Sequence, residues 1–137
     1  MSHNYYKLYY HLIWTTKNRL PIITSPIEEI LKNFIVAKAY SVNAQVLEIG
    51  IVENHLHMLV SVPPVMSVSE FVDLIKGGSS RQVNACGQEC LFYWQNNFGV
   101  LSVSEKDLFS VGRYVHNQKQ HHKNKFLINE FEMIEFQ

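Results

Sequence analysis

Residues 46–62, VLEIGIVENHLHMLVSV, are the stretch of sequence that decides the fold. Two runs inside it, residues 46–52 and 55–62, are rich in the branched apolar side chains that favour β-strands. Only Glu53 and Asn54 stand between the runs, so we expect the two strands to pair as an antiparallel hairpin. The flanking segments must then pack around this hairpin.

Strands and helices alternate on both sides of the hairpin. Residues 5–15, YYKLYYHLIWT, and a short run at 100–103 are predicted strands because they are rich in aromatic and branched side chains. Two helices are predicted, over residues 25–43 and from Ser67 onward, and they begin with the capping-box patterns SPIE and SVSE. The pair Gly77-Gly78 predicts a bend or a break in the second helix.

The order strand, helix, strand, strand, helix, strand predicts an α+β fold of the ferredoxin-like (RRM-like) class, as a single domain over residues 1–137. Two helices would cover one face of a four-stranded antiparallel sheet. Because side chains alternate along a strand, His55 and His57 should lie on the other face. An extra C-terminal helix, from about residue 105 to 122, would pack there and aim Tyr114 at the sheet. Its apolar stripe consists of Leu108, Val111 and Val115.

The composition is that of a packed globular protein, since 47% of the 137 residues are hydrophobic. No apolar run reaches the roughly 18 residues of a membrane helix, and the first residues lack a signal-peptide pattern. We therefore expect a cytoplasmic protein without a membrane partner. Cys86 and Cys90 are the only cysteines, too few for a structural zinc site, and we expect both to be reduced.

The formal net charge is zero, which by itself argues against a nucleic-acid-binding protein. The charges are nevertheless unevenly distributed, because residues 1–27 and 108–129 contain basic residues and no acidic residue. If these segments meet in space, they form a positive surface that could follow a phosphate backbone. An ordinary solvated surface with scattered charges explains the pattern equally well.

Four polar residues are candidates for chemistry. His55 and His57, on one side of a strand, could hold a cation between two imidazoles. Tyr114 and Gln118 have the i,i+4 spacing of neighbours on a helix. Each pair also has a simpler explanation. A His-x-His pattern on a strand is more often two hydrogen-bonded histidines than a metal site, and a helical tyrosine usually serves packing.

Five blocks of this chain resemble successive blocks of one known family. They are HLIWTTKNRLPII (11–23), ENHLHMLVSVPP (53–64), DLIKGGSSRQVN (73–84), FYWQNNFGVLSVS (92–104) and RYVHNQKQHHKNKF (113–126). The family is that of the small single-tyrosine transposases of the IS200-like type, which carry an HUH motif (histidine, hydrophobic, histidine). The blocks are most similar to its REP-associated tyrosine transposase branch.

The resemblance implies an enzyme that cuts and rejoins single-stranded DNA beside a hairpin. It implies that Tyr114 is the nucleophile, which forms a 5′-phosphotyrosine and leaves a free 3′-OH. It also implies that His55, His57 and Gln118 bind a divalent metal, magnesium or manganese, and that the protein is a homodimer. Asn54 departs from the family, which often has aspartate before the first histidine.

Six basic residues are candidate DNA contacts, and each could equally be a solvated charge. They are Lys17, Arg19, Lys76, Arg81, Lys119 and Lys123. His121 and His122 match the tail of the family, but no chemical role follows for them.

Elementary chemistry supports a role for a divalent metal in this reaction. A phenol with a pKa of about 10 is a poor nucleophile at neutral pH, so the phosphate must be strongly polarised. A divalent cation supplies that polarisation. Ligand softness alone would favour zinc, manganese or iron over magnesium at a histidine pair. The resemblance to the family nevertheless implies magnesium, and manganese remains beside it as a candidate metal.

Three alternatives remain open. The same sandwich could be a non-catalytic module that binds single-stranded nucleic acid through aromatic side chains. The chain could also be a domesticated relative that processes repeat hairpins of its host. A metal-dependent hydrolase, the third alternative, would leave no DNA attached to the protein.

Overall fold

The computed structural model describes residues 4–87 and 91–119. Its elements follow the predicted order: β1 (Tyr9–Thr15), η1 (Lys17–Arg19), α1 (Ser25–Ser41), β2 (Gln45–Val52), β3 (His55–Ser61), α2 (Val68–Ala85), β4 (Gly99–Val103), η2 (Glu105–Asp107) and α3 (Leu108–His116). Within the described ranges, no helix has the length and hydropathy needed to cross a bilayer.

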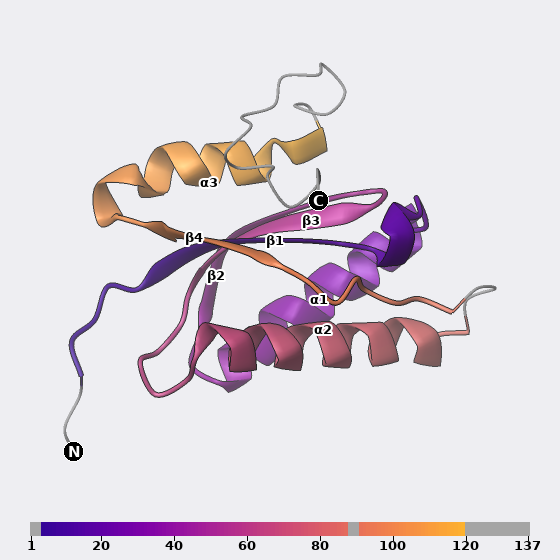
Figure 1. Ribbon diagram of the computed structural model, residues 1–137, viewed down its shortest axis with the longest axis horizontal. Coiled ribbons are helices and arrows are strands. Elements are labelled where there is room, and N and C mark those ends of the chain that lie inside the picture. The colour runs from indigo at the N-terminus through magenta and orange to yellow at the C-terminus, as the bar shows by residue number, and fades with distance from the viewer. Residues whose placement is uncertain (1–3, 88–90, 120–137) are drawn as a thin grey trace.

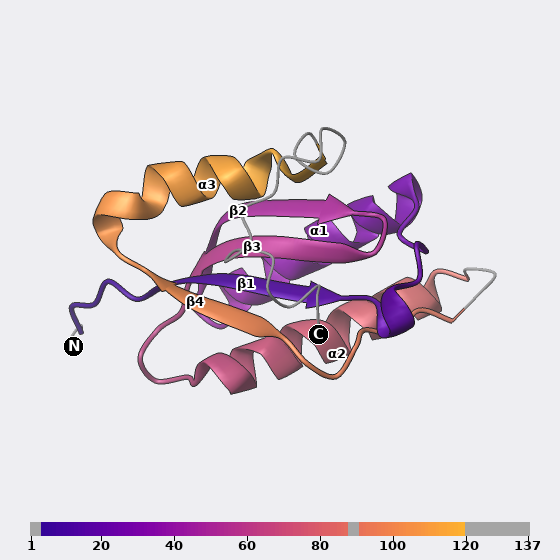
Figure 2. The ribbon, with the colours of Figure 1, turned by 45° about the horizontal axis from the view of Figure 1, so that its top comes forward.

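The four strands form one antiparallel sheet in the order β2-β3-β1-β4. The helices α1 and α2 cover one face of this sheet, and α3 lies across the other (Figure 1). Turning the molecule shows the strands side by side between these two helical layers (Figure 2). The predicted ferredoxin-like class, with an extra helix on the second face, is confirmed.

Alternation along β3 sorts its side chains between two cores, as predicted. Leu56 and Met58 belong to the main core, which α1 and α2 cover. Leu59 points the other way and packs with Val111 and Val115 of α3 in a smaller cluster. Full burial of such a side chain stabilises the fold by about 1.5–3 kcal/mol. The second cluster therefore fixes α3 on the sheet.

A β-bulge in β2 determines which residues face α3. The register of β2 against β3 shifts between Val46 and Glu48, which leaves Leu47 as an extra residue. Beyond the bulge, Gly50 pairs with His57. Paired residues lie on the same face of a sheet, so Gly50 faces α3 together with that histidine.

The N-terminus of α1 differs from the prediction, whereas that of α2 agrees with it. Thr24 is the N-cap of α1, without a side-chain capping bond in the described structure, and Ser25 is the first helical residue. The capping box of α2 is confirmed. Ser67 Oγ accepts from the Glu70 amide at 3.0 Å, and Glu70 Oε1 accepts from the Ser67 amide at 3.2 Å.

The bend predicted at the glycine pair of α2 is wrong, because α2 runs without interruption from Val68 to Ala85. A Cβ built on Gly78 would overlap the ring of Phe34 in α1. The glycine therefore lets α1 and α2 approach each other closely instead of breaking the helix.

The C-terminal helix is also shorter than predicted. It ends at His116, and Asn117 is its C-cap. Residues 118 and 119 are helical again after this turn, and residues 120–122 of the predicted helix lie outside the described residues.

Candidate active site

β3 places two histidines next to each other on the face of the sheet that α3 covers. The side chains of His55 and His57 are 2% and 0% exposed, and their ring centroids lie 5.2 Å apart. The strand pairs with β2 and β1 on its two sides, so its backbone is held rigidly. The pair is thus buried on the side predicted for it.

Asn54, at the tip of the β2–β3 hairpin, orients the first histidine. His55 Nδ1 lies 2.8 Å from Asn54 Oδ1. Because an amide oxygen only accepts hydrogen bonds, His55 donates from Nδ1 and carries its lone pair on Nε2. Asn54 therefore holds the imidazole without supplying a charge.

A third histidine, which the sequence analysis did not single out, belongs to the same cluster. His11 of β1 is fully buried, and its Nε2 lies 2.7 Å from His57 Nδ1. The signal in the sequence that could have identified His11 was a polar side chain within the apolar run of the first predicted strand. The predicted fold class places β1 beside β3, but the sequence alone does not give the register of the pair, which brings the two rings together.

Tyr114 reaches the histidine cluster from α3. It is 4% exposed, and its ring centroid lies 5.8 Å from that of His57 and 6.4 Å from that of His11, edge-on in both cases. Val111 and Val115, on the same helix, pack onto the sheet and so direct the tyrosine toward these rings.

Gln118 lies beside Tyr114 just beyond the end of α3. Its Nε2 donates to the Tyr114 carbonyl oxygen at 3.2 Å, and its side chain is 1% exposed. Since the amide nitrogen is directed at the backbone and cannot ligate a metal, Oε1 is the atom suited to that task. Gly50 makes room for this arrangement, because a Cβ there would lie 2.8 Å from Gln118 Cγ.

These donors fit a small divalent cation. Two imidazole nitrogens and an amide oxygen are ordinary ligands of manganese and leave coordination positions open for phosphate and water. The described residues contain no group of three or more His, Cys, Asp or Glu side chains arranged for a metal. Gln118, whose amide oxygen is predicted from the sequence as a ligand, lies just beyond the helix that carries Tyr114.

The first two candidate DNA contacts, Lys17 and Arg19, lie in η1, directly after β1, and both are exposed. The Lys17 ammonium is 6.0 Å from the centre of the half-exposed Tyr93 ring. Asn18 and Arg19 both have left-handed backbone angles, with φ of 57° and 56°. Non-glycine residues adopt this conformation at a cost, and such strain concentrates at functional sites.

The other candidate contacts have different surroundings. The Lys76 ammonium donates to the backbone carbonyls of Gln95 and Asn97, and burial lowers the pKa of Lys76, an effect that Asp73 opposes. Arg81 is exposed on α2, which covers the opposite face of the sheet. Lys119 forms an ion pair with Glu28. Lys123 lies outside the described residues.

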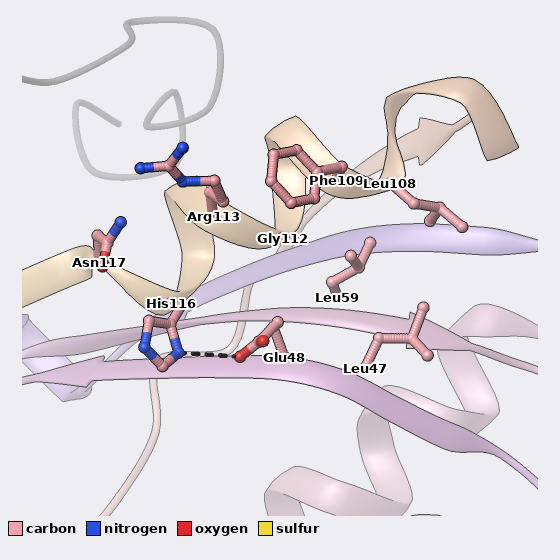
Figure 3. A pocket seen from close by; sticks show the side chains of 9 residues that line it. All are labelled: Leu47, Glu48, Leu59, Leu108, Phe109, Gly112, Arg113, His116 and Asn117. Atoms are coloured by element: carbon pink, nitrogen blue, oxygen red, sulfur yellow. Dashed lines mark hydrogen bonds and ion pairs between the residues drawn. The ribbon is translucent and has the colours of Figure 1, made fainter.

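A separate pocket of about 580 Å³ lies between α3 and the strands β2 and β3. Figure 3 shows its apolar floor and the contact between His116 Nδ1 and Glu48 Oε2, which lie 3.2 Å apart. None of the predicted site residues lines it. The lining residues are Leu47, Glu48, Leu59, Leu108, Phe109, Gly112, Arg113, His116 and Asn117. The histidine cluster, rather than this pocket, carries the groups suited to catalysis.

Comparison with known proteins places the chain in a family. A family model described as "Transposase IS200 like" matches residues 4–118, a span that contains the histidines, Tyr114 and Gln118. The chain belongs to this family. The family and the transposase function predicted from the sequence are confirmed, and the chain is a DNA-cleaving enzyme.

Two curated relatives of this IS200-like transposase are themselves named transposases. The ISDra2 transposase TnpA of Deinococcus radiodurans is 28% identical over 119 residues, which cover 82% of this chain and 85% of the relative. The transposase for insertion sequence element IS200 of Salmonella typhimurium is 26% identical over 96 residues, which cover 70% of this chain and 63% of the relative.

Two solved structures share the fold of the transposase. A crystal structure of a Deinococcus radiodurans protein described as a transposase superposes with a TM-score of 0.67 at 25% identity, covering 86% of this chain and 96% of that one. A REP-associated tyrosine transposase bound to a REP hairpin superposes with a TM-score of 0.66 at 17% identity, covering 89% of this chain and 74% of that one. At that identity the second likeness concerns the fold alone.

Proposed function

We propose that this transposase cuts and rejoins single-stranded DNA at hairpin-flanked sites through a covalent bond between the DNA and Tyr114. The observation that carries the proposal is the convergence of Tyr114, from α3, with His57, from β3, at 5.8 Å between ring centroids. His55 and Gln118 lie beside them and complete a donor set for a cation. Residues far apart in the sequence thus meet as a nucleophile beside a candidate metal site.

The reaction is a transesterification. The Tyr114 oxygen attacks the phosphorus, a bond from this oxygen to phosphorus forms, and the bond from phosphorus to the 3′-oxygen breaks. The tyrosine proton is lost, and the departing oxygen takes up a proton to become a 3′-OH. Attack of a 3′-OH on the phosphotyrosine reverses the step, so no nucleotide cofactor is needed.

His55, His57 and Gln118 would hold magnesium or manganese. When bound there, the cation supplies charge neutralisation at the phosphate oxygens and so compensates for the weak nucleophilicity of a phenol. The histidines are buried, and electrostatic effects are stronger in a buried site than in bulk water.

The proposed partner is a DNA hairpin with a single-stranded flank. A REP-associated tyrosine transposase of the same fold binds a REP hairpin, which supports a hairpin partner here. Lys17 and Arg19 are the exposed candidates for phosphate contacts, and Tyr93 offers a ring for base stacking beside Lys17. Such a substrate implies that the enzyme works in the cytoplasm.

We also propose that the enzyme is a homodimer. β2 and β4 are the edges of the sheet, and Val100 on β4 is 44% exposed. An exposed edge strand can pair with a second copy of the chain. Light scattering should give a molar mass twice the 16.0 kDa of one chain.

Denaturing gel electrophoresis tests the covalent chemistry. Hairpin-flanked single-stranded DNA carrying a label at its 3′ end is incubated with the transposase and Mn²⁺. The label should migrate with the wild-type protein and not with Tyr114→Phe, since only a 5′-phosphotyrosine retains the 3′ fragment. Tyr40→Phe is the matched control, because Tyr40 is 82% exposed on α1, on the other face of the sheet.

Two results of that assay would contradict the proposal. Cleavage by Tyr114→Phe without protein-bound label would indicate a hydrolase. Binding without cleavage, on DNA from beside its own gene, would favour the non-catalytic binding module. A domesticated relative would have the same chemistry, and repeats or hairpins flanking the gene would distinguish it from a transposase that mobilises its own element.

A further inference from the structure

His11 makes a buried contact that the proposed reaction has not used. It lies in β1, which pairs with β3 on one side and with β4 on the other, so its backbone is fixed within the sheet. Its side chain is fully buried, and its Nε2 is 2.7 Å from His57 Nδ1. The two ring centroids are 5.0 Å apart, so the contact is one short hydrogen bond between tilted rings.

The chemistry of a neutral imidazole gives this hydrogen bond a direction. Such a ring carries one N–H donor and one nitrogen lone pair. If His57 ligates a metal through Nε2, its proton must be on Nδ1, and Nδ1 must donate to His11. His11 Nε2 is then the acceptor, and the proton of His11 is on its own Nδ1.

We infer that His11 is a positioning residue, which accepts a hydrogen bond from His57 Nδ1 and thereby directs His57 Nε2 at the metal. This inference rests on the proposed function. Partners of this kind fix the tautomer and the ring orientation of metal-binding histidines. His11 also contacts the Tyr114 ring, at 6.4 Å between centroids. One side chain therefore aligns the ligand with the nucleophile.

The neighbouring histidine is held in the same way, which supports the inference independently. His55 Nδ1 donates to Asn54 Oδ1 at 2.8 Å. Both histidines of the pair thus have Nδ1 engaged by a side chain outside the proposed ligand set. One partner comes from the hairpin turn and the other from the central strand β1, and both arrangements leave Nε2 as the ligating atom.

Nitrogen-15 NMR of the histidine rings in the metal-free wild-type protein provides the first test. At about pH 8 an unperturbed imidazole is neutral, so its two tautomers can be distinguished. We expect His57 as the Nδ1–H tautomer. Finding His57 as the Nε2–H tautomer would overturn the inference, because His11 would then be the donor. This measurement needs no variant of His11.

Binding of Mn²⁺ to the DNA-free protein, followed by electron paramagnetic resonance, provides the second test. His11→Phe keeps a ring in the cavity but offers no acceptor, and we expect its affinity for Mn²⁺ to fall about tenfold to hundredfold. His11→Gln places an amide oxygen near the position of Nε2 and should restore most of the affinity. His116→Phe is the matched control, because His116 contacts Glu48 instead of the pair and should bind Mn²⁺ like wild type.

The outcomes separate the two proposals. Wild-type affinity in His11→Phe, together with a normal phosphotyrosine yield from wild type, would overturn the inference alone. An affinity that depends on His11 in a protein that never forms phosphotyrosine would support the inference and contradict the proposed function. Absence of Mn²⁺ binding by the wild-type protein, together with absence of any phosphotyrosine, would overturn both.

Discussion

At the scale of single residues, Gly50 determines how closely the end of α3 approaches β2. A Cβ built on Gly50 would overlap the Val115 carbonyl oxygen and would lie 2.8 Å from Gln118 Cγ. Only a residue without a side chain permits this approach. Gly50 thus positions Gln118, a proposed ligand, although it offers no chemical group of its own.

Gly50→Ala should displace the end of α3 together with Gln118. We expect the free energy of unfolding to fall by about 1–3 kcal/mol, because the added carbon strains the packing. The affinity for Mn²⁺ should fall about tenfold, because one ligand is moved. Urea titration and electron paramagnetic resonance measure the two effects.

Gly112→Ala is the matched control for that substitution. Its added Cβ would lie 3.6 Å from the nearest atoms of Glu48 and Leu59, an ordinary contact. Alanine in a helix is favoured over glycine by about 1 kcal/mol, so the control should be neutral or more stable. Equal affinities of the two variants for Mn²⁺ would contradict the role assigned to Gly50.

At the scale of elements, a small charge cluster links α1 to the residues that follow α3. The Glu28 carboxylate forms an ion pair with Lys119 and lies 3.3 Å from Lys32 Nζ. Burial raises the pKa of Glu28, but hydrogen bonds from the two lysines outweigh burial, and the net pKa lies below 4.5. Lys119 directly follows Gln118, so the cluster helps to hold this proposed ligand in place.

Glu28→Gln should therefore destabilise the protein in a pH-dependent way. The pKa is lower in the folded than in the unfolded state, so the stabilisation is present above pH 4.5 and is lost as the pH falls through the folded value. Because Lys119 is 64% exposed, solvent screening limits the loss at pH 7 to about 1 kcal/mol or less.

Thermal unfolding of both proteins between about pH 7 and pH 3 measures this dependence. The difference between wild type and Glu28→Gln should shrink as the pH is lowered. Glu29→Gln changes an exposed neighbour on the same helix and serves as the control. A difference that stays constant with pH would rule out the ionised pair as its cause.

At the scale of the whole molecule, the main core and the proposed catalytic cluster lie on different faces of the sheet. The main core lies between the sheet and the helices α1 and α2, on the face opposite the histidines. Removal of metal with EDTA should therefore abolish cleavage and leave a cooperatively folded protein. Circular dichroism during heating measures the folding. Loss of helical signal on chelation would show instead that the metal is structural.

The fold could be predicted from the sequence because its strands and helices carry clear periodic patterns. The direction of the histidine pair follows from alternation along β3. His11 could not be assigned in advance, because its contact with His57 depends on the register of β1 against β3. The position of Gly50 on the face toward α3 depends in addition on the bulge at Leu47. Local sequence patterns describe elements, whereas these two residues act through the register between elements.

The measurement that tests the central claim most directly is mass spectrometry of the trypsin-digested covalent complex. Trypsin cleaves after Arg113 and Lys119 and releases the peptide YVHNQK, residues 114–119, in which Tyr114 is the single tyrosine. The account predicts that the DNA phosphate is attached to this peptide. Attachment to a peptide containing another tyrosine, or cleaved DNA with no modified peptide, would contradict it.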